Sequence, residues 1–394
     1  MHNPELRGKA FAVCGDPAKR SGIVLAKSEL AKKAGVKTGD AIWEAKQKCP
    51  GLIIVSTNHG DYSKYSKIVR EVYYRYTDKV EAFGGDEAWL DISGSRKLMT
   101  NDKLVMTNDC GIDFGKRIAD EIRRVIREEI GLTVSVGVSW NKTYAKLGSD
   151  LKKPDATTVI SRDNYRDVVF PLPVTDMLYV GRKTARLLEK LNVKTIGDLA
   201  AFDPKILEGH FGINAYKMVT MARGEDDSLV ADYHYKREVK SVGNGTTLPR
   251  DLVTRREVEH VVYLLSEEVA YRMRKKGVKG YTVNLSVRDK DLAWSGAQSS
   301  IREATNSVQT ITKTAMKIFD QKGIMPVRSL RVAVSNLTTD KRVQLSLLDD
   351  AREDRNDKIS AAFDTIRRKH GTNSVMFGTG LGGDFKLEFE VLDN

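Results

Sequence analysis

A pair of adjacent carboxylates beside a double glycine constrains this chain most. Asp86 and Glu87 follow Gly84 and Gly85, and apolar runs stand on both sides within Val80–Ile92. This pattern predicts a β-hairpin with the acids at its turn. Neighbouring strand residues point to opposite faces, so both carboxylates serve one site only where the glycines let the backbone bend. Paired carboxylates suit Mg²⁺ shared with substrate phosphates, although an acidic pair in a turn is more often solvated.

The composition is typical of a soluble protein with several domains. The chain has 394 residues, 41% hydrophobic and 30% charged, and is too long for one ordinary core. It has no apolar run long enough to cross a membrane, and its first residues lack the apolar core of a signal peptide. Three cysteines, Cys14, Cys49 and Cys110, lie far apart without metal-ligand spacing. They favour reduced thiols in a cytoplasmic protein.

The positive charge is concentrated in one segment. The formal net charge is +12, and residues 236–342 hold 21 Lys and Arg against 11 Asp and Glu. A local excess favours a dedicated nucleic-acid-binding domain over a generally solvated basic surface. The same segment predicts a four-stranded sheet backed by two helices. The expected strands are Lys236–Val242, Tyr281–Arg288, Ala297–Ser300 and Leu330–Ser335, and the expected helices are Arg255–Lys276 and Ser307–Gln321.

Basic and hydroxyl side chains along these strands are the candidates for DNA contact. They are Lys240, Ser241, Arg288 and Arg331. Their chemistry suits a phosphate backbone better than base readout.

The first 170 residues alternate between strand and helix patterns, which predicts a layered α/β or α+β structure. Ser28 is the expected N-cap of a short helix, and Gly131 is expected to stop a long one. The strands are expected at Lys9–Cys14, Gly22–Ala26, Leu52–Ser56 and Thr133–Ser139, and the helices at Ser28–Ala34, Asp40–Lys48, Tyr62–Tyr76, Phe114–Ile130 and Asn141–Leu151.

A different pattern begins at Val174, where two short helices are joined by a tight turn. Gly181, Arg182 and Lys183 stand at the start of one helix. A glycine-bearing turn before a helix exposes backbone N–H groups that can hold a phosphate. An ordinary helical turn is the alternative. The segment is not a Walker loop, because its lysine does not directly follow the glycine.

The C-terminal region contains two further patterns. Leu345, Leu347 and Leu348 form an apolar run in a polar, loop-like region. This run is either a docking peptide or a strand end folded onto its own domain. A helix is expected at Arg352–His370. Residues 378–383 match a nucleotide-binding glycine pattern but lack the helix that must follow, so we expect a glycine loop.

Three long motifs in fixed order make the chain resemble the polymerase IV/UmuC group of Y-family translesion DNA polymerases. They span Phe83–Asp91, Gly137–Pro154, and Lys240–Gly243 with Thr246–Pro249. The resemblance runs from residue 3 to residue 370. It implies an α+β multidomain fold like a right hand, with palm, fingers, a helical thumb bearing a helix-hairpin-helix-like motif, and a βαββαβ little finger.

The resemblance also implies domain boundaries. The palm would comprise residues 1–10 and 57–170, the fingers 11–56, the thumb 171–232 and the little finger 233–340. Residues 341–394 would hold a clamp-binding peptide, a helix and a tail.

By the same resemblance the chain would be a DNA-directed DNA polymerase that adds dNTPs to a primer by two-metal phosphoryl transfer, in DNA repair and SOS damage tolerance. Asp86 and Glu87 would be the catalytic ligands of two Mg²⁺ ions. Lys32 and Lys153 would contact the nucleotide. Gly181, with the two basic residues after it, would grip DNA phosphates in the thumb.

Further lysines and the apolar peptide complete the implied set. Lys142 and Lys146 would be either substrate-side or structural bases. The peptide Gln344, Leu345, Leu347 and Leu348 resembles a bacterial sliding-clamp-binding sequence. The expected partners are therefore primer-template DNA, dNTP and the clamp. We expect a monomer with no membrane association.

One departure from the family affects the expected activity. Family members begin with a strand carrying an aspartate that binds both metals, and an aromatic pair follows it. This chain matches the family only after that segment, and its first aspartate, Asp16, lies in a Gly-Asp-Pro turn. We therefore expect the first palm strand and the first metal ligand to be missing. The alternative function is a truncated, non-catalytic relative that binds damaged or primer-template DNA and the clamp. A helix-hairpin-helix module of another kind ranks last.

Overall fold

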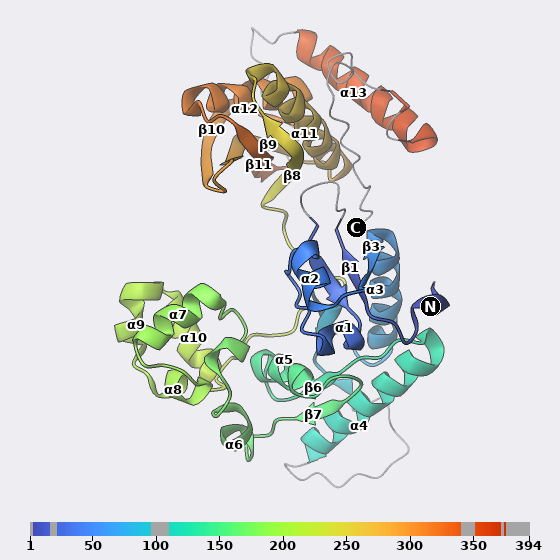
Figure 1. Ribbon diagram of the computed structural model, residues 1–394, viewed down its shortest axis with the longest axis vertical. Helices are drawn as coiled ribbons and strands as arrows, with labels where there is room; N and C mark the ends of the chain where they lie inside the picture. The colour runs from blue at the N-terminus through green and yellow to red at the C-terminus, as the bar shows by residue number, and fades with distance from the viewer. Residues whose placement is uncertain (1–2, 16–21, 96–109, 340–350, 372–373, 376–394) are drawn as a thin grey trace. The chain divides into compact units, whose positions relative to one another are not determined.

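The computed structural model describes residues 3–15, 22–95, 110–339, 351–371 and 374–375 (Figure 1). The chain divides into two compact units, one formed by Met1–Asn58 with Arg237–Leu392 and the other centred on His59–Lys236. We describe each unit by itself. None of the described helices combines the length and apolar character needed to cross a membrane.

A small mixed sheet organises the N-terminal part of the first unit. Strand β1 (Phe11–Cys14) pairs antiparallel with β2 (Val24–Lys27) and parallel with β3 (Ile53–Ser56). Helix α1 (Glu29–Lys33) begins at Ser28, whose Oγ accepts a hydrogen bond from Ala31 N at 3.3 Å. The predicted strands and N-cap are confirmed. Before the sheet lies the 3₁₀ turn Pro4–Leu6, and after α1 lies α2 (Ile42–Lys48).

A larger antiparallel sheet forms the rest of this unit. Its strands have the order β10–β9–β11–β8, and helices α11 and α12 cover one face (Figure 1). The predicted order of strands and helices is confirmed. The elements are β8 (Ser241–Leu252), α11 (Arg255–Lys275), β9 (Lys279–Asp289), β10 (Trp294–Thr305), α12 (Val308–Lys322) and β11 (Val327–Thr338).

Several bounds of this sheet were predicted wrongly. Strands β10 and β11 extend beyond the predicted Ala297–Ser300 and Leu330–Ser335 at both ends, and β8 continues past Val242 to Leu252. The first strand begins at Ser241, not at Lys236. Its ladder with β11 ends at the pair Ser241–Ser335, so the preceding residues have no ladder partner. Lys240 therefore lies just before the strand.

Alternation along β9 separates the two faces of the large sheet. Val283, Leu285 and Val287 are buried beneath the helices. The residues between them belong to the opposite face, because successive strand residues point to opposite sides. We call this opposite side the open face.

The predicted C-terminal helix is confirmed as α13 (Ala351–His370). Two ion pairs join it to α11. Arg274 Nε lies 2.7 Å from Asp364 Oδ2, and Arg367 Nη2 lies 2.8 Å from Glu267 Oε1. All four side chains are largely buried. The apolar peptide before α13 and the glycine pattern after it lie outside the described residues.

The second unit contains two separate two-stranded sheets. Among its described residues, β4 (Val80–Phe83) pairs antiparallel with β5 (Glu87–Leu90), and β6 (Val136–Val138) pairs parallel with β7 (Thr157–Val159). The predicted strand Thr133–Ser139 is thus shorter than expected, because β7 pairs with only its central residues. Helix α3 (His59–Tyr74) precedes β4. Helix α4 (Cys110–Val125), continued by a π-helical turn to Ile130, lies between β5 and β6 in the chain, and α5 (Lys142–Leu151) lies between β6 and β7.

A cluster of short helices completes this unit. Buried Leu188, Ile196, Leu199 and Leu207 form much of its core. The predicted pair of helices joined by a turn is confirmed as α7 and α8. The cluster contains α6 (Tyr165–Val169), the 3₁₀ turn Val174–Asp176, α7 (Arg182–Lys190), α8 (Ile196–Ala201), α9 (Pro204–Phe211) and α10 (Asn214–Ala222).

Helix α5 is central to the second unit. A Cβ added to Gly137 on β6 would lie 1.9 Å from the carbonyl oxygen of Ala145, so only glycine permits this approach of strand and helix. At the other side, Asn141 Nδ2 and Trp140 Nε1 donate to the carbonyl of Gly224, at 2.9 and 3.0 Å. The N-terminal end of α5 is therefore tied to the segment that leaves the helical cluster.

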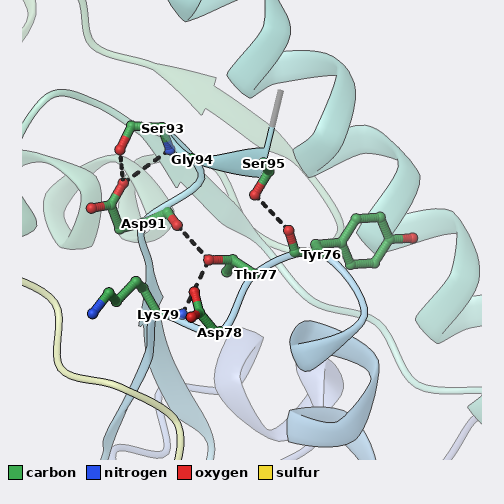
Figure 2. Close-up of a pocket in the computed structure, with 8 residues that line it drawn as sticks. All are labelled: Tyr76, Thr77, Asp78, Lys79, Asp91, Ser93, Gly94 and Ser95. Carbon is green, nitrogen blue, oxygen red and sulfur yellow. Dashed lines mark hydrogen bonds between the residues drawn. The ribbon is translucent and has the colours of Figure 1, made fainter. Parts of the chain in front are cut away.

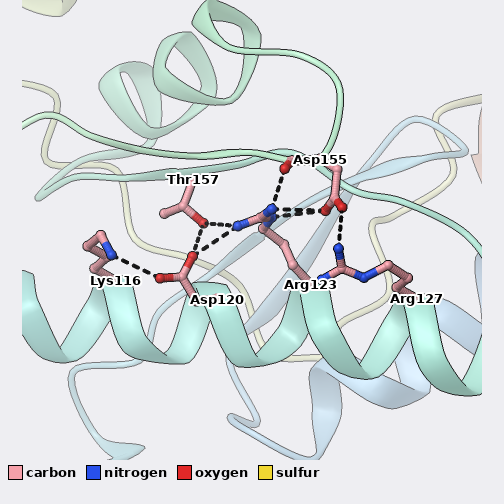
Figure 3. A network of polar contacts seen from close by, with 6 residues as sticks. All are labelled: Lys116, Asp120, Arg123, Arg127, Asp155 and Thr157. Atoms are coloured by element: carbon pink, nitrogen blue, oxygen red, sulfur yellow. Dashed lines mark hydrogen bonds and ion pairs between the residues drawn. The ribbon is translucent and has the colours of Figure 1, made fainter.

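A network of charges fastens the loop after α5 to α4 (Figure 3). Arg123 donates through Nε and Nη2 to Asp155 Oδ1, at 3.1 and 3.0 Å, and also contacts the carbonyl of Asp155. Arg127 Nη1 lies 2.7 Å from the other carboxylate oxygen. Asp120 accepts from Thr157 Oγ1 at 2.7 Å. The loop carrying Lys153 is thus held from α4.

Gly137→Ala should destabilise the second unit strongly. The new methyl group meets helix backbone, which cannot rotate away, so we expect a loss of about 3 kcal/mol. The control is Gly209→Ala in α9, where an added Cβ meets nothing within 4 Å and helix propensity favours alanine by ~1 kcal/mol. Urea unfolding followed by circular dichroism measures both. Equal stability of Gly137→Ala and wild type would contradict the packing argument.

Asp120 should contribute to acid sensitivity. Its hydrogen bond from Thr157, with Lys116 and Arg123 nearby, holds the pKa of Asp120 below its ordinary value. A carboxylate with a lowered folded-state pKa stabilises the protein above its unfolded pKa of about 3.9 and loses this contribution as pH falls through the folded value. Asp120→Asn should lower the thermal midpoint at pH 7, and its difference from wild type should shrink as the pH falls below about 3.9. The control is Asp163→Asn, at an exposed site. If the thermal midpoints of wild type and Asp120→Asn ran parallel across this pH range, the proposed contribution of Asp120 would be refuted.

Candidate active site and nucleic-acid interface

The acid pair lies at the hairpin predicted for it. Phe83 pairs with Glu87 across a turn formed by Gly84, Gly85 and Asp86. Gly84 has φ +74°, which a residue with a side chain adopts only at a cost. Asp86 is exposed in the turn, and Glu87 is the first residue of β5. The two carboxylates thus stand at the break between turn and strand, where the strict alternation of faces does not apply.

The two acids have different neighbours. Glu87 Oε1 lies 2.9 Å from Lys146 Nζ on α5. Asp86 acts on Tyr73 of α3, since burial and the negative charge of Asp86 together raise the pKa of Tyr73 to about 12. Tyr73 is therefore a neutral phenol at physiological pH.

A row of alternating charges leads from the hairpin to the end of α5. Lys146 Nζ also lies 2.6 Å from Asp150 Oδ2, and Asp150 Oδ1 lies 2.7 Å from Lys153 Nζ. Burial by itself lowers the pKa of Lys146, but the contacts with Asp150 and Glu87 outweigh it and raise that pKa. The structure therefore brings Glu87 and Lys153 into one charge network, which we call the acid–lysine row.

Sequence reasoning missed Asp150 and left the role of Lys146 open. The sequence carried a signal for this row. Asp150 lies four residues after Lys146 and three before Lys153, a spacing that brings side chains together on a helix and in the turn that ends it. Lys142 could be a substrate-side or a structural base, and its buried partner favours the structural role. Its Nζ lies 2.5 Å from Glu81 Oε2, and both side chains are largely buried. Trp89 Nε1 also donates to the Lys142 carbonyl at 3.0 Å, so Lys142 is a structural base.

The acid pair fits part of a magnesium site. Mg²⁺ in phosphoryl-transfer sites is commonly bound by one or two carboxylates together with substrate phosphates. Two carboxylates on consecutive residues at a turn meet this requirement for one ion. Over the described ranges, no group of three or more His, Cys, Asp or Glu side chains is placed to hold a metal.

A cavity of about 410 Å³ lies at the other end of the hairpin (Figure 2). Its polar groups are paired with one another. Thr77 Oγ1 donates to the Asp91 carbonyl at 2.6 Å, and Ser95 Oγ donates to the Tyr76 carbonyl at 2.5 Å. These bonds close the base of the ribbon, far along both strands from Asp86. The cavity therefore lies apart from the acid pair.

The predicted phosphate grip falls at the start of α7. Gly181 is the N-cap of α7 and makes no side-chain capping bond to the first turn. Arg182 and Lys183 are exposed beside it. The N–H groups of the first turn and two cations therefore stand together at this helix end.

The candidate DNA-binding residues of the first unit lie on or beside the open face. Arg331 on β11 pairs with Ser286 on β9, and Arg288 lies further along the same face. Ser241 begins β8, and Lys240 is exposed just before it. The structure thus groups these residues on one sheet.

The remaining candidates lie elsewhere. Lys32 is on α1 in the first unit, where its Nζ lies 3.7 Å from Glu29 Oε1 and both side chains are exposed. Asp86 and Lys153 belong to the other unit. Gln344, Leu345, Leu347 and Leu348 lie outside the described residues.

Comparison with known proteins connects these features to a family. The impB/mucB/samB family matches residues 1–150, and its C-terminal domain matches residues 239–347. DNA polymerase IV of Acetivibrio thermocellus is 42% identical over 382 residues, which cover 96% of this chain and 92% of that protein. DNA polymerase IV 2 of Bacillus subtilis is 34% identical and covers 96% of this chain and 90% of its own length.

A solved structure has the same fold. A Y-family DNA polymerase chimera superposes with a TM-score of 0.73 at 24% identity, covering 86% of this chain and 95% of its own. This likeness confirms the predicted α+β right-hand fold. Together with relatives that share sequence along nearly the whole chain, it shows that this chain belongs to the impB/mucB/samB family of Y-family translesion DNA polymerases.

Proposed function

We propose that the chain is a DNA-directed DNA polymerase that extends a primer past lesions in the template. The observation that carries this proposal is the acid–lysine row, which links Glu87 beside Asp86 to Lys153 through three ion pairs. An acid pair and a lysine held in one network suit the two ends of a metal-bound triphosphate. The relatives named DNA polymerase IV support the same reaction.

In this reaction a primer 3′-oxygen attacks the α-phosphate of a dNTP and pyrophosphate leaves. Two Mg²⁺ ions would stabilise the charge that develops on the attacking and leaving oxygens. Asp86 and Glu87 would hold the metal side of the site. Lys153 would bind the triphosphate through its ammonium group. Lys32 on α1 stays a predicted nucleotide contact that rests on the resemblance alone. Lys146 would keep the Glu87 carboxylate in place.

Two surfaces would hold primer-template DNA. The N-terminus of α7, with Gly181, Arg182 and Lys183, offers backbone N–H groups and cations to a phosphate. The open face of the large sheet offers Ser241, Arg288 and Arg331, with Lys240 at its edge. We propose that these are the thumb and little-finger contacts of a monomeric cytoplasmic enzyme acting in SOS damage tolerance, with the domain boundaries that the sequence predicts.

The number of acidic side chains available to bind metal favours a second candidate function, DNA binding without catalysis. The described residues provide two carboxylates at the hairpin turn and no third acid grouped with them. A chain with this set could bind primer-template DNA and the sliding clamp without extending the primer. Its DNA-binding surfaces would be the same.

Primer extension separates the two functions. If the chain is a polymerase, it should extend a primer opposite a template lesion in Mg²⁺. Asp86→Ala or Glu87→Ala should then lower the rate by at least about 10²-fold, since each removes a metal ligand worth several kcal/mol. Asp163→Ala is the control for loss of an exposed acid. Full activity of the Asp86 or Glu87 variant would refute the ligand assignment, and DNA binding without extension by wild type would favour the second function.

We further propose that Gln344, Leu345, Leu347 and Leu348 bind a bacterial sliding clamp. Gln344→Ala combined with Leu347→Ala should weaken clamp binding by about 30-fold, because buried anchors dominate such interfaces. Binding of the full chain to labelled clamp measures this effect. Gln321→Ala, at an exposed position of α12, is the control. Wild-type clamp affinity of the double variant would return the peptide to a purely structural role.

A further inference from the structure

The open face of the large sheet carries one large aromatic side chain at the strand positions that the structure describes. Trp294 is the first residue of β10 and pairs directly with Arg288 on β9. Its side chain is 55% exposed. Alternation places it on the same side as Ser286 and Arg288, away from the helices.

The rest of this face is small and polar. Its paired strand positions hold glycines, hydroxyls, amides and one alanine, with Arg288 and Arg331 as the cations and no acidic residue among them. Trp294 therefore projects from an otherwise low surface. The neutral positions of this face are Ser241, Gly243, Gly245, Thr247, Thr282, Asn284, Ser286, Gly296, Gln298, Ser300, Ser329, Ala333 and Ser335, of which Thr282 and Ser329 are buried.

The Trp294 indole and the Arg288 guanidinium are in contact and ordered before any ligand binds. Arg288 Cζ lies 5.7 Å from the centre of the Trp294 ring, and Arg288 Nε donates to the Leu292 carbonyl at 3.0 Å. The turn itself is closed, because Asp289 Oδ1 accepts from Ala293 N at 2.9 Å. Little side-chain entropy is lost when a ligand binds groups that are already ordered.

We propose that Trp294 and Arg288 form a stacking platform for an unpaired nucleobase of single-stranded DNA. This inference rests on the proposed DNA-binding role of the sheet and goes beyond it, because the phosphate contacts do not need an aromatic group. An indole face stacks on any base, and an adjacent arginine adds cation–π and phosphate attraction. Bases inside a duplex are already stacked on their neighbours, so the platform selects unpaired template.

Charge and shape favour DNA over a protein as the occupant. A stable protein interface usually has an apolar core made by several neighbouring side chains. Around Trp294 the face instead presents glycines, hydroxyls, amides and two arginines. A strand of DNA needs one stacking surface and nearby cations, and this face provides both.

The test measures binding of the full chain to oligo(dT) and to a blunt duplex of equal length by fluorescence anisotropy, across a salt series. Trp294→Leu keeps an apolar side chain but removes the stacking surface, whereas Trp294→Phe keeps an aromatic ring. Tyr281→Leu is the matched control, because Tyr281 is an exposed aromatic on the neighbouring strand β9, on the helix-covered side of the sheet. Arg331→Ala reports the phosphate contacts.

Trp294→Leu should weaken oligo(dT) binding by about tenfold and leave duplex binding within about twofold of wild type. Its log–log salt slope should match wild type, whereas Arg331→Ala should reduce the slope by about 0.7. Trp294→Phe should retain most of the affinity, and Tyr281→Leu all of it. All variants should share the wild-type thermal midpoint.

Other results would overturn the inference. These are wild-type oligo(dT) affinity of Trp294→Leu, an equal loss on the duplex, or a reduced salt slope like that of Arg331→Ala. If Arg331→Ala weakens binding while Trp294→Leu does not, only the stacking platform fails. If neither variant affects either DNA, the proposed DNA-binding role of the sheet fails as well.

Discussion

The close contact between β6 and α5 sets the position of the charged groups that face the acid pair at the candidate active site. Gly137 lets the strand approach the helix backbone more closely than any side chain would allow. The helix placed in this way carries Lys146 and Asp150 on one side. Its N-terminal end holds the Gly224 carbonyl through Asn141. A shift of this helix would therefore move both the charges near the acid pair and the attachment of the helical cluster.

The acid–lysine row follows from that placement. Lys146 is largely buried, and a buried ammonium is tolerated only where carboxylates compensate for its lost hydration. Glu87 and Asp150 supply this compensation at 2.9 and 2.6 Å. The same contacts fix the direction of the Glu87 side chain. In the proposed reaction, the structure would thus hold a metal ligand in position before substrate arrives.

In the large sheet, one physical rule produces two surfaces. Alternation along β9 sends Val283, Leu285 and Val287 into the core and leaves the intervening residues on the open face. The apolar side stabilises the domain, and the polar side is free to take its character from function. Arg288 lies near the end of this strand, opposite Trp294, where the hairpin turn orders both side chains.

The sequence by itself determined the local elements and the acid pair, because these depend on neighbouring residues. Gly84 and Gly85 predict the turn that presents Asp86 and Glu87, and Ser28 predicts a helix start. The three motifs in fixed order predict the family. Tertiary structure decided which lysine contacts the acid pair. Lys142 and Lys146 are equally plausible in the sequence, but one is buried against Glu81 and the other meets Glu87. Such pairings join residues more than fifty positions apart, and only the packing of strand against helix brings them within reach.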